Sequence, residues 1–188
     1  MNQTVAIIGT RKPTEDQIAK AEMLAAELSA RGYIIKTGGA YGIDHAAMRK
    51  TVPGFLEVYL PWETYNAEII PEHAKRIVFN PAIHKEWLHS VTTYHPAPQL
   101  LTSGMRALHA RNYGIVEGCG VVIALPEKME KGGSGQGVRI ARALRIPVMQ
   151  QEANVGLFDS SQGAILQLAL DTLRRQRWPI LRTTNYIN

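Results

Sequence analysis

The sequence predicts an α/β fold: a doubly wound parallel sheet with helices on both faces. Short apolar runs alternate along the chain with stretches in which apolar residues recur at helical spacing. The runs are apolar throughout, which is typical of strands buried on both faces of a parallel sheet. Because crossovers between parallel strands are right-handed, we expect a Rossmann-like arrangement, with one domain over residues 1–188.

Five strands are predicted from the apolar runs. The first, Thr4–Gly9 (TVAIIG), ends in glycine, and the third, Phe55–Leu60 (FLEVYL), is stopped by Pro61. The others are Tyr33–Thr37, Val121–Leu125 and a strand that begins at Pro147–Met149.

Helices are predicted between these strands. The first begins with a capping box, in which Thr14 is the cap and Gln17 lies three residues on, and Gly32 stands where a C-terminal cap belongs. The segment 62–110 is less regular, and its prolines divide it into short helices and loops. Later helices are predicted from Asp44 onward, over Leu100–Tyr113, over Val138–Leu144, and from a cap at Asp159 or Ser160 to Trp178-Pro179.

The composition excludes several classes of protein. The 188 residues, 45% hydrophobic and 20% charged, have the balance of a soluble globular domain. No apolar run approaches the roughly 18 residues of a membrane span, and no basic leader opens the chain, so we expect a cytoplasmic protein without a membrane partner. The single cysteine, Cys119, excludes a disulfide framework within the chain and suits a small buried position. We also expect a homo-oligomer, because compact folds of this type self-associate.

The positive charge lies in the second half of the chain. Residues 1–94 are balanced, whereas residues 95–188 carry 11 Lys and Arg against 6 Asp and Glu and hold the whole net charge of +5. A positive field suits an anionic partner such as a nucleotide or nucleic acid, although a solvated basic face explains it equally well. The same two interpretations apply to three arginines at three-residue spacing, Arg139, Arg142 and Arg145. They could follow a phosphodiester backbone, or they could form a solvated helix face.

Three glycine-bearing loops follow predicted strands and so share one edge of the sheet. They are Gly9-Thr10-Arg11, Gly38 to Asp44 and Gly132 to Gly137. Glycine lets the main chain approach a ligand closely, and a helix N-terminus behind the loop favours phosphate. Arg11 could pair with that phosphate, and Asp44 could cap its helix or accept from a ribose hydroxyl. The spacing matches neither the dinucleotide fingerprint nor a phosphate-binding loop ending in Gly-Lys-Ser/Thr, which disfavours ordinary NAD dehydrogenases and NTPases.

These loops carry a resemblance to a known family. The stretches VAIIGTRKPT and TGGAYGIDHAAMR, followed by ARNYGIVEGCGVVIAL and GGSGQGVRIARALRIPV, resemble the DNA-processing protein A (Smf) family and its small relatives in the SLOG superfamily, over about residues 4–150. The resemblance implies a pocket that binds a nucleotide or another phosphate-bearing ligand. The implied lining residues are Gly9, Thr10, Arg11, Gly38, Gly39, Ala40, Gly42, Asp44, Arg111, Asn112, Gly133, Ser134, Gly135, Gln136 and Gly137.

The relatives imply two further activities. The full DNA-processing protein binds single-stranded DNA and loads a recombinase, but this chain has no room for its flanking domains, so we do not expect recombinase loading. The LOG relatives release a base from nucleoside monophosphates with a glutamate in the motif Gly-Gly-x-Gly-Thr-x-x-Glu. Here Arg139 stands at that glutamate, a charge reversal that disfavours the reaction and favours anion binding.

Other candidate residues have simpler alternatives. Trp62 follows the third strand and could stack on a base, with Asn66 donating a hydrogen bond, or could pack under segment 62–110. The six histidines lack metal-ligand spacing, so we predict no metal.

We therefore expect a protein that senses or sequesters a nucleotide-like ligand without turnover and needs no further cofactor. Single-stranded DNA binding is the alternative, with Arg139 and Arg142 contributing. A nucleotide N-glycosidase using Glu117 or Asp44 is a second alternative.

Overall fold

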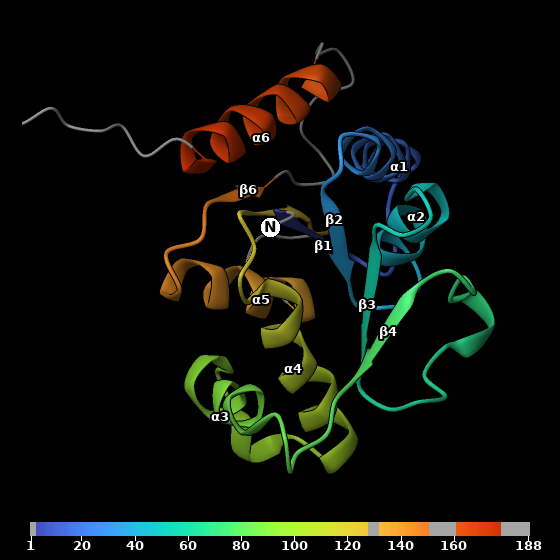
Figure 1. Ribbon diagram of the computed structural model, residues 1–188. Coiled ribbons are helices and arrows are strands. Elements are labelled where there is room, and N and C mark those ends of the chain that lie inside the picture. Colours follow the sequence, from blue (N-terminus) through green and yellow to red (C-terminus); the bar gives the residue numbers. More distant parts are fainter. Residues whose placement is uncertain (1–2, 128–131, 151–160, 178–188) are drawn as a thin grey trace, which may run out of the picture.

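One parallel sheet, in the order β4-β3-β2-β1-β5-β6, forms the centre of the molecule (Figure 1). The computed structural model describes residues 3–127, 132–150 and 161–177. Within them the strands are β1 (Thr4–Gly9), β2 (Ile34–Thr37), β3 (Leu56–Leu60), β4 (Lys75–Val78), β5 (Val121–Leu125) and β6 (Val148–Gln150). The chain builds outward from β1 in one direction as far as β4 and then returns to add β5 on its other side, so the strand order reverses between β1 and β5.

Helices cover both faces of the sheet, as the continuously apolar strands predict. They are α1 (Glu15–Ala30), α2 (Ile43–Lys50), α3 (Lys85–Tyr94), α4 (Ser103–Val116), α5 (Gly132–Ala143) and α6 (Ser161–Arg177), with short 3-10 turns η1 (Ala67–Ile69) and η2 (Pro98–Leu100). Alternate residues of β1 enter opposite cores: Val5 and Ile7 pack with α1, α2 and α6, whereas Ala6 and Ile8 pack with α3, α4 and α5 (Figure 1). The predicted doubly wound α/β fold is confirmed.

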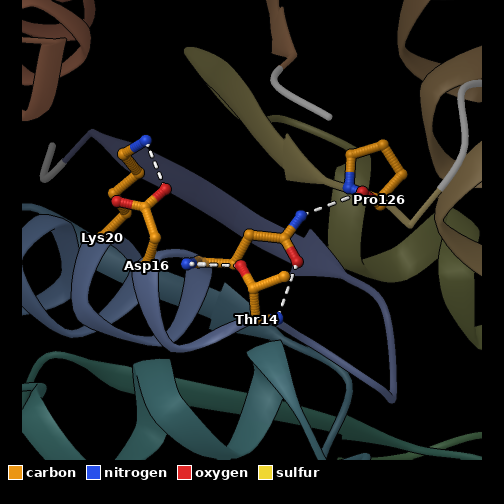
Figure 2. Close-up of polar contacts among 5 residues, drawn as sticks. Thr14, Asp16, Lys20 and Pro126 are labelled. Carbon is orange, nitrogen blue, oxygen red and sulfur yellow. Dashed lines mark hydrogen bonds and ion pairs between the residues drawn. The ribbon is translucent and has the colours of Figure 1, made fainter. Parts of the chain in front are cut away.

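The start of α1 is also confirmed in detail (Figure 2). Thr14 Oγ1 accepts from Gln17 N at 3.3 Å, and Gln17 Oε1 accepts from Thr14 N at 3.2 Å, which completes the capping box. The amide of Gln17 has a further role, since its Nε2 donates to the carbonyl of Pro126 at 3.0 Å. One residue therefore joins the N-terminus of α1 to the segment that leaves β5. At the other end of α1, Gly32 has φ +82° and follows the C-cap residue Arg31, as a terminating glycine should.

Two elements differ from the sequence prediction. Strand β4 lies in the segment expected to hold only short helices and loops; its sequence, KRIV, begins with two exposed charged residues because it is an edge strand. Helix α5 begins at Gly132, six residues before the predicted start at Val138, so the third glycine loop is helical. The proposed caps at Asp159 and Ser160 and the stop at Trp178-Pro179 lie outside the described residues.

Tertiary packing explains one of the glycines in the first half of α5. A Cβ at Gly137 would lie 2.7 Å from Ile8 Cδ1, so this glycine lets the helix approach β1 closely. Close packing on the sheet thus outweighs the low helix propensity of glycine. In the described part of the chain, no helix is both long and apolar enough to cross a membrane.

Candidate ligand-binding cavity

A cavity of about 680 Å³ lies where the order of the strands reverses. The segments that follow β1, β2 and β5 meet there at the carboxyl edge of the sheet. Thr10 N donates to the carbonyl of Leu125 at 3.0 Å, and Ile43 N donates to the carbonyl of Thr10 at 3.1 Å. Backbone hydrogen bonds therefore join the turn after β1 to the turn after β2 and to the end of β5.

Most of the predicted residues line this cavity. Those that do are Gly9, Thr10, Arg11, Ala40, Asp44, Arg111, Asn112, Gly133, Ser134 and Gly137. Those that do not line it are Gly38, Gly39, Gly42, Gly135 and Gln136. Whether the lining residues bind a ligand stays a prediction.

The glycines serve packing more than ligand approach. A Cβ at Gly9 would lie 2.5 Å from the Leu125 carbonyl oxygen, and one at Gly42 would lie 2.3 Å from the Thr10 carbonyl oxygen. Gly42 also has φ +86°, a conformation that side chains disfavour. These two glycines bring the chain segments together instead of opening the backbone to a ligand. At the N-terminus of α5 the backbone is open, since a Cβ at Gly132 would meet nothing within 4 Å.

A buried pair of opposite charges forms the floor of the cavity. Asp44 and Arg111 are each only 6% exposed. Burial raises the pKa of the Asp44 carboxyl, and the charge of Arg111 opposes that shift. Burial likewise lowers the pKa of the Arg111 guanidinium, and Asp44 opposes that shift; the guanidinium remains charged, as arginine does in proteins.

Neighbouring backbone holds this pair in place. The Asp44 carboxylate accepts from Ala40 N at 3.2 Å. Gly38 lies against Arg111 so closely that a Cβ would fall 1.7 Å from Nη1. The Nε of Arg111 is buried, makes no hydrogen bond with any described group, and belongs to a residue of the cavity wall. It is a donor without an acceptor, which is uncommon for a buried charged group.

A chain of amide hydrogen bonds connects α4 with α5 beside the cavity. The carboxamide oxygen of the fully buried Gln136 accepts from Asn112 Nδ2 at 2.9 Å and pairs with Nδ1 of His109. Asn112 Nδ2 also lies 3.4 Å from the carbonyl of Gly133. Burial lowers the pKa of His109, whose imidazole is therefore neutral at pH 7.

The remaining walls combine positive charge with apolar surface. Arg11 and Lys12 line one side, and the first three residues of α5 (Gly132, Gly133 and Ser134) contribute the N-terminus of a helix, where unpaired N–H groups and a partial positive charge favour anions. Helix α4 supplies an apolar wall. Its lining side chains are Met105, Leu108, Ile115 and Val116.

Several lining residues were not predicted from the sequence. They are Ile8, Lys12, Met105, Leu108, His109, Ile115, Val116 and Glu127. The sequence could have indicated Lys12 and Glu127 as cavity residues, since each closely follows the end of a predicted strand. The residues of α4 had none, because only the packing of that helix shows which of its faces borders the cavity.

Other candidates lie elsewhere. Arg139 does not line the cavity; its Nε donates to the Tyr94 carbonyl at 2.9 Å. Glu117 is also remote, because it ends α4 at the opposite edge of the sheet, so of the two proposed carboxylates only Asp44 lines the cavity. Trp62 is 40% exposed, packs edge-on against Tyr65 and does not line the cavity.

The remaining predictions concern Cys119 and metals. Cys119 is buried, as expected, and burial raises the pKa of its thiol, which makes it a poor nucleophile. The described residues contain no group of three or more metal-ligating side chains.

Comparison with known proteins identifies the family. The family model for DNA recombination-mediator protein A matches residues 1–169. The chain belongs to this family. No curated protein matches its sequence.

Solved structures agree with this membership. The DNA processing protein A of Helicobacter pylori, described for its single-stranded DNA binding mode, is 25% identical, with a TM-score of 0.62 over 93% of this chain and 81% of that chain. The DNA processing protein A of Streptococcus pneumoniae is 19% identical, with a TM-score of 0.53 over 89% of this chain and 56% of that one. A molybdenum cofactor binding protein from Rippkaea orientalis is 19% identical, with a TM-score of 0.57 over 92% of this chain and 87% of that one. The last two likenesses show the shared fold alone, which hosts different ligands.

Proposed function

We propose that the cavity of this family member binds a phosphate-bearing ligand of nucleotide size and that the protein senses or sequesters it. The cavity lies at the strand-order reversal, where open α/β sheets bind their ligands. Its volume of about 680 Å³ is ordinary for a small-molecule site.

The positive charge that borders the cavity is the observation that carries the proposal. The charged guanidinium of Arg111 in the cavity floor favours negative charge in the cavity, although its Nε atom is too deeply buried for a ligand to reach. Arg11, Lys12 and the N-terminus of α5 border the same space and favour the same charge. The apolar wall from α4 suits the base of a nucleotide, which stacks and packs without needing many hydrogen bonds.

Equilibrium binding of a mononucleotide panel to the full chain tests this proposal. We expect Arg11→Ala to weaken binding about 10- to 100-fold, since one charge-assisted hydrogen bond contributes about 1.5–3 kcal/mol. Arg174→Ala is the matched control, because Arg174 is exposed on α6 and, among the described residues, forms an ion pair with Asp171 at 3.6 Å. If both variants bind like the parent chain, the site is misplaced.

Single-stranded DNA is the second candidate ligand. The Helicobacter pylori relative is described as binding it, and Trp62 offers an exposed aromatic face close to the cavity. A Cβ at Gly104 would lie 3.9 Å from the Trp62 ring, and the next residue, Met105, lines the cavity. A strand with one phosphate in the cavity could thus stack a neighbouring base on Trp62.

Oligonucleotide binding separates the two candidates. The DNA interpretation predicts an affinity that falls steeply with salt and drops about 5- to 100-fold in Trp62→Ala, since stacking contributes about 1–3 kcal/mol per base. Binding of mononucleotides without oligonucleotides would exclude it. Native mass spectrometry of the purified chain would report any ligand that co-purifies and also test the predicted homo-oligomer.

A further inference from the structure

The hydrogen bonds beside the cavity fix which ring nitrogen of His109, a histidine that lines it, carries the proton. The chain of constraints begins at the Gly133 carbonyl, which can only accept, so the nearer Asn112 side-chain atom, at 3.4 Å, is its Nδ2 amide. That same Nδ2 lies 2.9 Å from Gln136, which must therefore present its oxygen. Gln136 pairs through this oxygen with Nδ1 of His109. An oxygen that only accepts requires a proton on Nδ1.

A neutral imidazole with its proton on Nδ1 has a free lone pair on Nε2. Gln136 is fully buried and does not line the cavity, whereas His109 does. The Nδ1 edge of the ring is therefore turned to the wall. No described residue makes a hydrogen bond to the Nε2 atom of His109. This atom is also not among the buried unpartnered atoms of the described residues. The ring thus offers an accessible acceptor on its other edge.

This acceptor is chemically different from most of the surrounding wall. Arg11, Lys12, Arg111 and the N-terminus of α5 present only donors or positive charge. The Asp44 carboxylate already accepts from Ala40 N and faces Arg111, and Glu127 is exposed. A phosphate would engage the donors, while a neutral nitrogen acceptor would engage an O–H or N–H group elsewhere on the same ligand.

We infer that His109 is a specificity-determining residue whose Nε2 accepts a hydrogen bond from a hydroxyl or amino group of the bound mononucleotide, and that Gln136 is the positioning residue that holds it in this tautomer. The inference rests on the proposed function, because it assumes that the cavity binds a nucleotide. A sugar hydroxyl and an exocyclic base amine share the required chemistry, and the test separates them.

Nitrogen-15 NMR of the histidine rings in the full chain reads the tautomer directly. Free histidine prefers the proton on Nε2, so a ring held as Nδ1–H is distinctive. We expect His109 to show Nδ1–H without ligand and its Nε2 resonance to move when a bound mononucleotide is added. His89 is the control, because it is exposed on α3 and should show the ordinary mixture throughout.

The probes are AMP, GMP, CMP and UMP with their 2′-deoxy forms, and IMP as an analogue of AMP without the amine. If the 2′-deoxy form of the bound nucleotide binds about 3- to 10-fold more weakly and leaves Nε2 unmoved, the partner is the sugar hydroxyl. If AMP is the nucleotide that binds, and IMP binds more weakly by that factor and leaves Nε2 unmoved, the partner is the base amine. That range corresponds to one neutral hydrogen bond.

Two variants separate recognition from structure. Gln136→Met removes the fixed acceptor, so His109 should return to the ordinary mixture of tautomers and affinity should fall by a similar factor. His109→Asn should lose the discrimination between the paired probes, whereas His89→Ala should keep both affinity and discrimination.

The failures are distinguishable. An Nε2–H tautomer in the free chain, or an Nε2 resonance that stays fixed while the tightest-binding ribonucleotide saturates the protein, overturns the inference and leaves the proposed function intact. If no mononucleotide binds the wild-type chain, the proposed function fails, and the assignment of His109 to ligand recognition fails with it.

Discussion

Arg111 illustrates how single residues shape this site. The guanidinium occupies the space that any side chain at position 38 would need, and it faces Asp44 in a region without solvent. The sequence associated both Gly38 and Arg111 with the site. It could not show that the glycine acts through the arginine, because the two lie more than 70 positions apart in the chain and meet only in the fold.

Gly38→Ala should therefore move the guanidinium away from Asp44. We expect a loss of about 1–3 kcal/mol in the free energy of unfolding, measured in urea, and about tenfold weaker mononucleotide binding. Gly163→Ala is the control, since a Cβ at Gly163 in α6 would meet nothing within 4 Å, and it should gain about 0.5–1 kcal/mol. Unchanged stability and affinity in Gly38→Ala would show that the guanidinium has room to move.

At the scale of elements, the sequence predicted the buried strands well, but it missed the edge strand β4 and the start of helix α5. The strands β1, β2, β3 and β5 are apolar runs whose burial needs no knowledge of the rest of the chain. Edge strand β4 begins with Lys75 and Arg76, and its pairing with β3 decides its structure. Helix α5 begins with a glycine-rich turn, and the close packing of Gly137 against Ile8 of β1 is visible only in the fold. Local patterns cannot report such long-range contacts.

The close contact between the turn after β1 and the turn after β2 depends on Gly42. Gly42→Ala should cost about 1–2 kcal/mol for its positive φ and a further 1–3 kcal/mol because the Thr10 carbonyl oxygen is backbone and cannot easily move. Gly118→Ala is the control for a positive φ without a close contact, since Gly118 has φ +70° with nothing within 4 Å. If Gly42→Ala and Gly118→Ala lose the same free energy of unfolding in urea, the contact between position 42 and the Thr10 carbonyl oxygen is not tight.

Gln17 offers a test of the link between α1 and β5. Gln17→Ala removes the acceptor of Thr14 N and the donor to Pro126, and we expect a loss of about 2–4 kcal/mol in unfolding free energy because two partners are left unpaired. Gln167→Ala removes only an exposed contact to Asp171 and should stay within about 0.5 kcal/mol. A small loss at Gln17 would indicate that water replaces both partners.

At the scale of the whole molecule, charge counted along the sequence proved a coarse guide. The excess lies in residues 95–188, which include Arg139, an arginine expected to favour anion binding. Yet Arg11 and Lys12, two cations of the cavity, come from the half with no net charge, and Arg139 bonds to Tyr94 instead. Folding selects which charges converge, so net charge suggests the class of partner without locating its site.

Stability should depend on pH through His109. Burial lowers the pKa of His109, and the hydrogen bond to Gln136 opposes that shift, while the charged or titratable groups that face the ring, His95, Arg111 and Arg139, lower the pKa further. A lowered pKa means that the unfolded chain binds more protons, so the free energy of unfolding should fall as pH drops below about 6.5, the ordinary histidine value. His109→Gln should make that fall shallower. Identical pH profiles for the two chains would show that His109 does not titrate differently on folding.

Amide NMR of the full chain titrated with AMP, GMP, CMP and UMP in turn tests the central claim most directly. If the cavity holds the phosphate between the turn after β1 and the N-terminus of α5, the largest shifts should fall at Thr10, Arg11, Gly133 and Ser134. Shifts confined to α6 or β4, or no shifts with any of the four nucleotides, would contradict it.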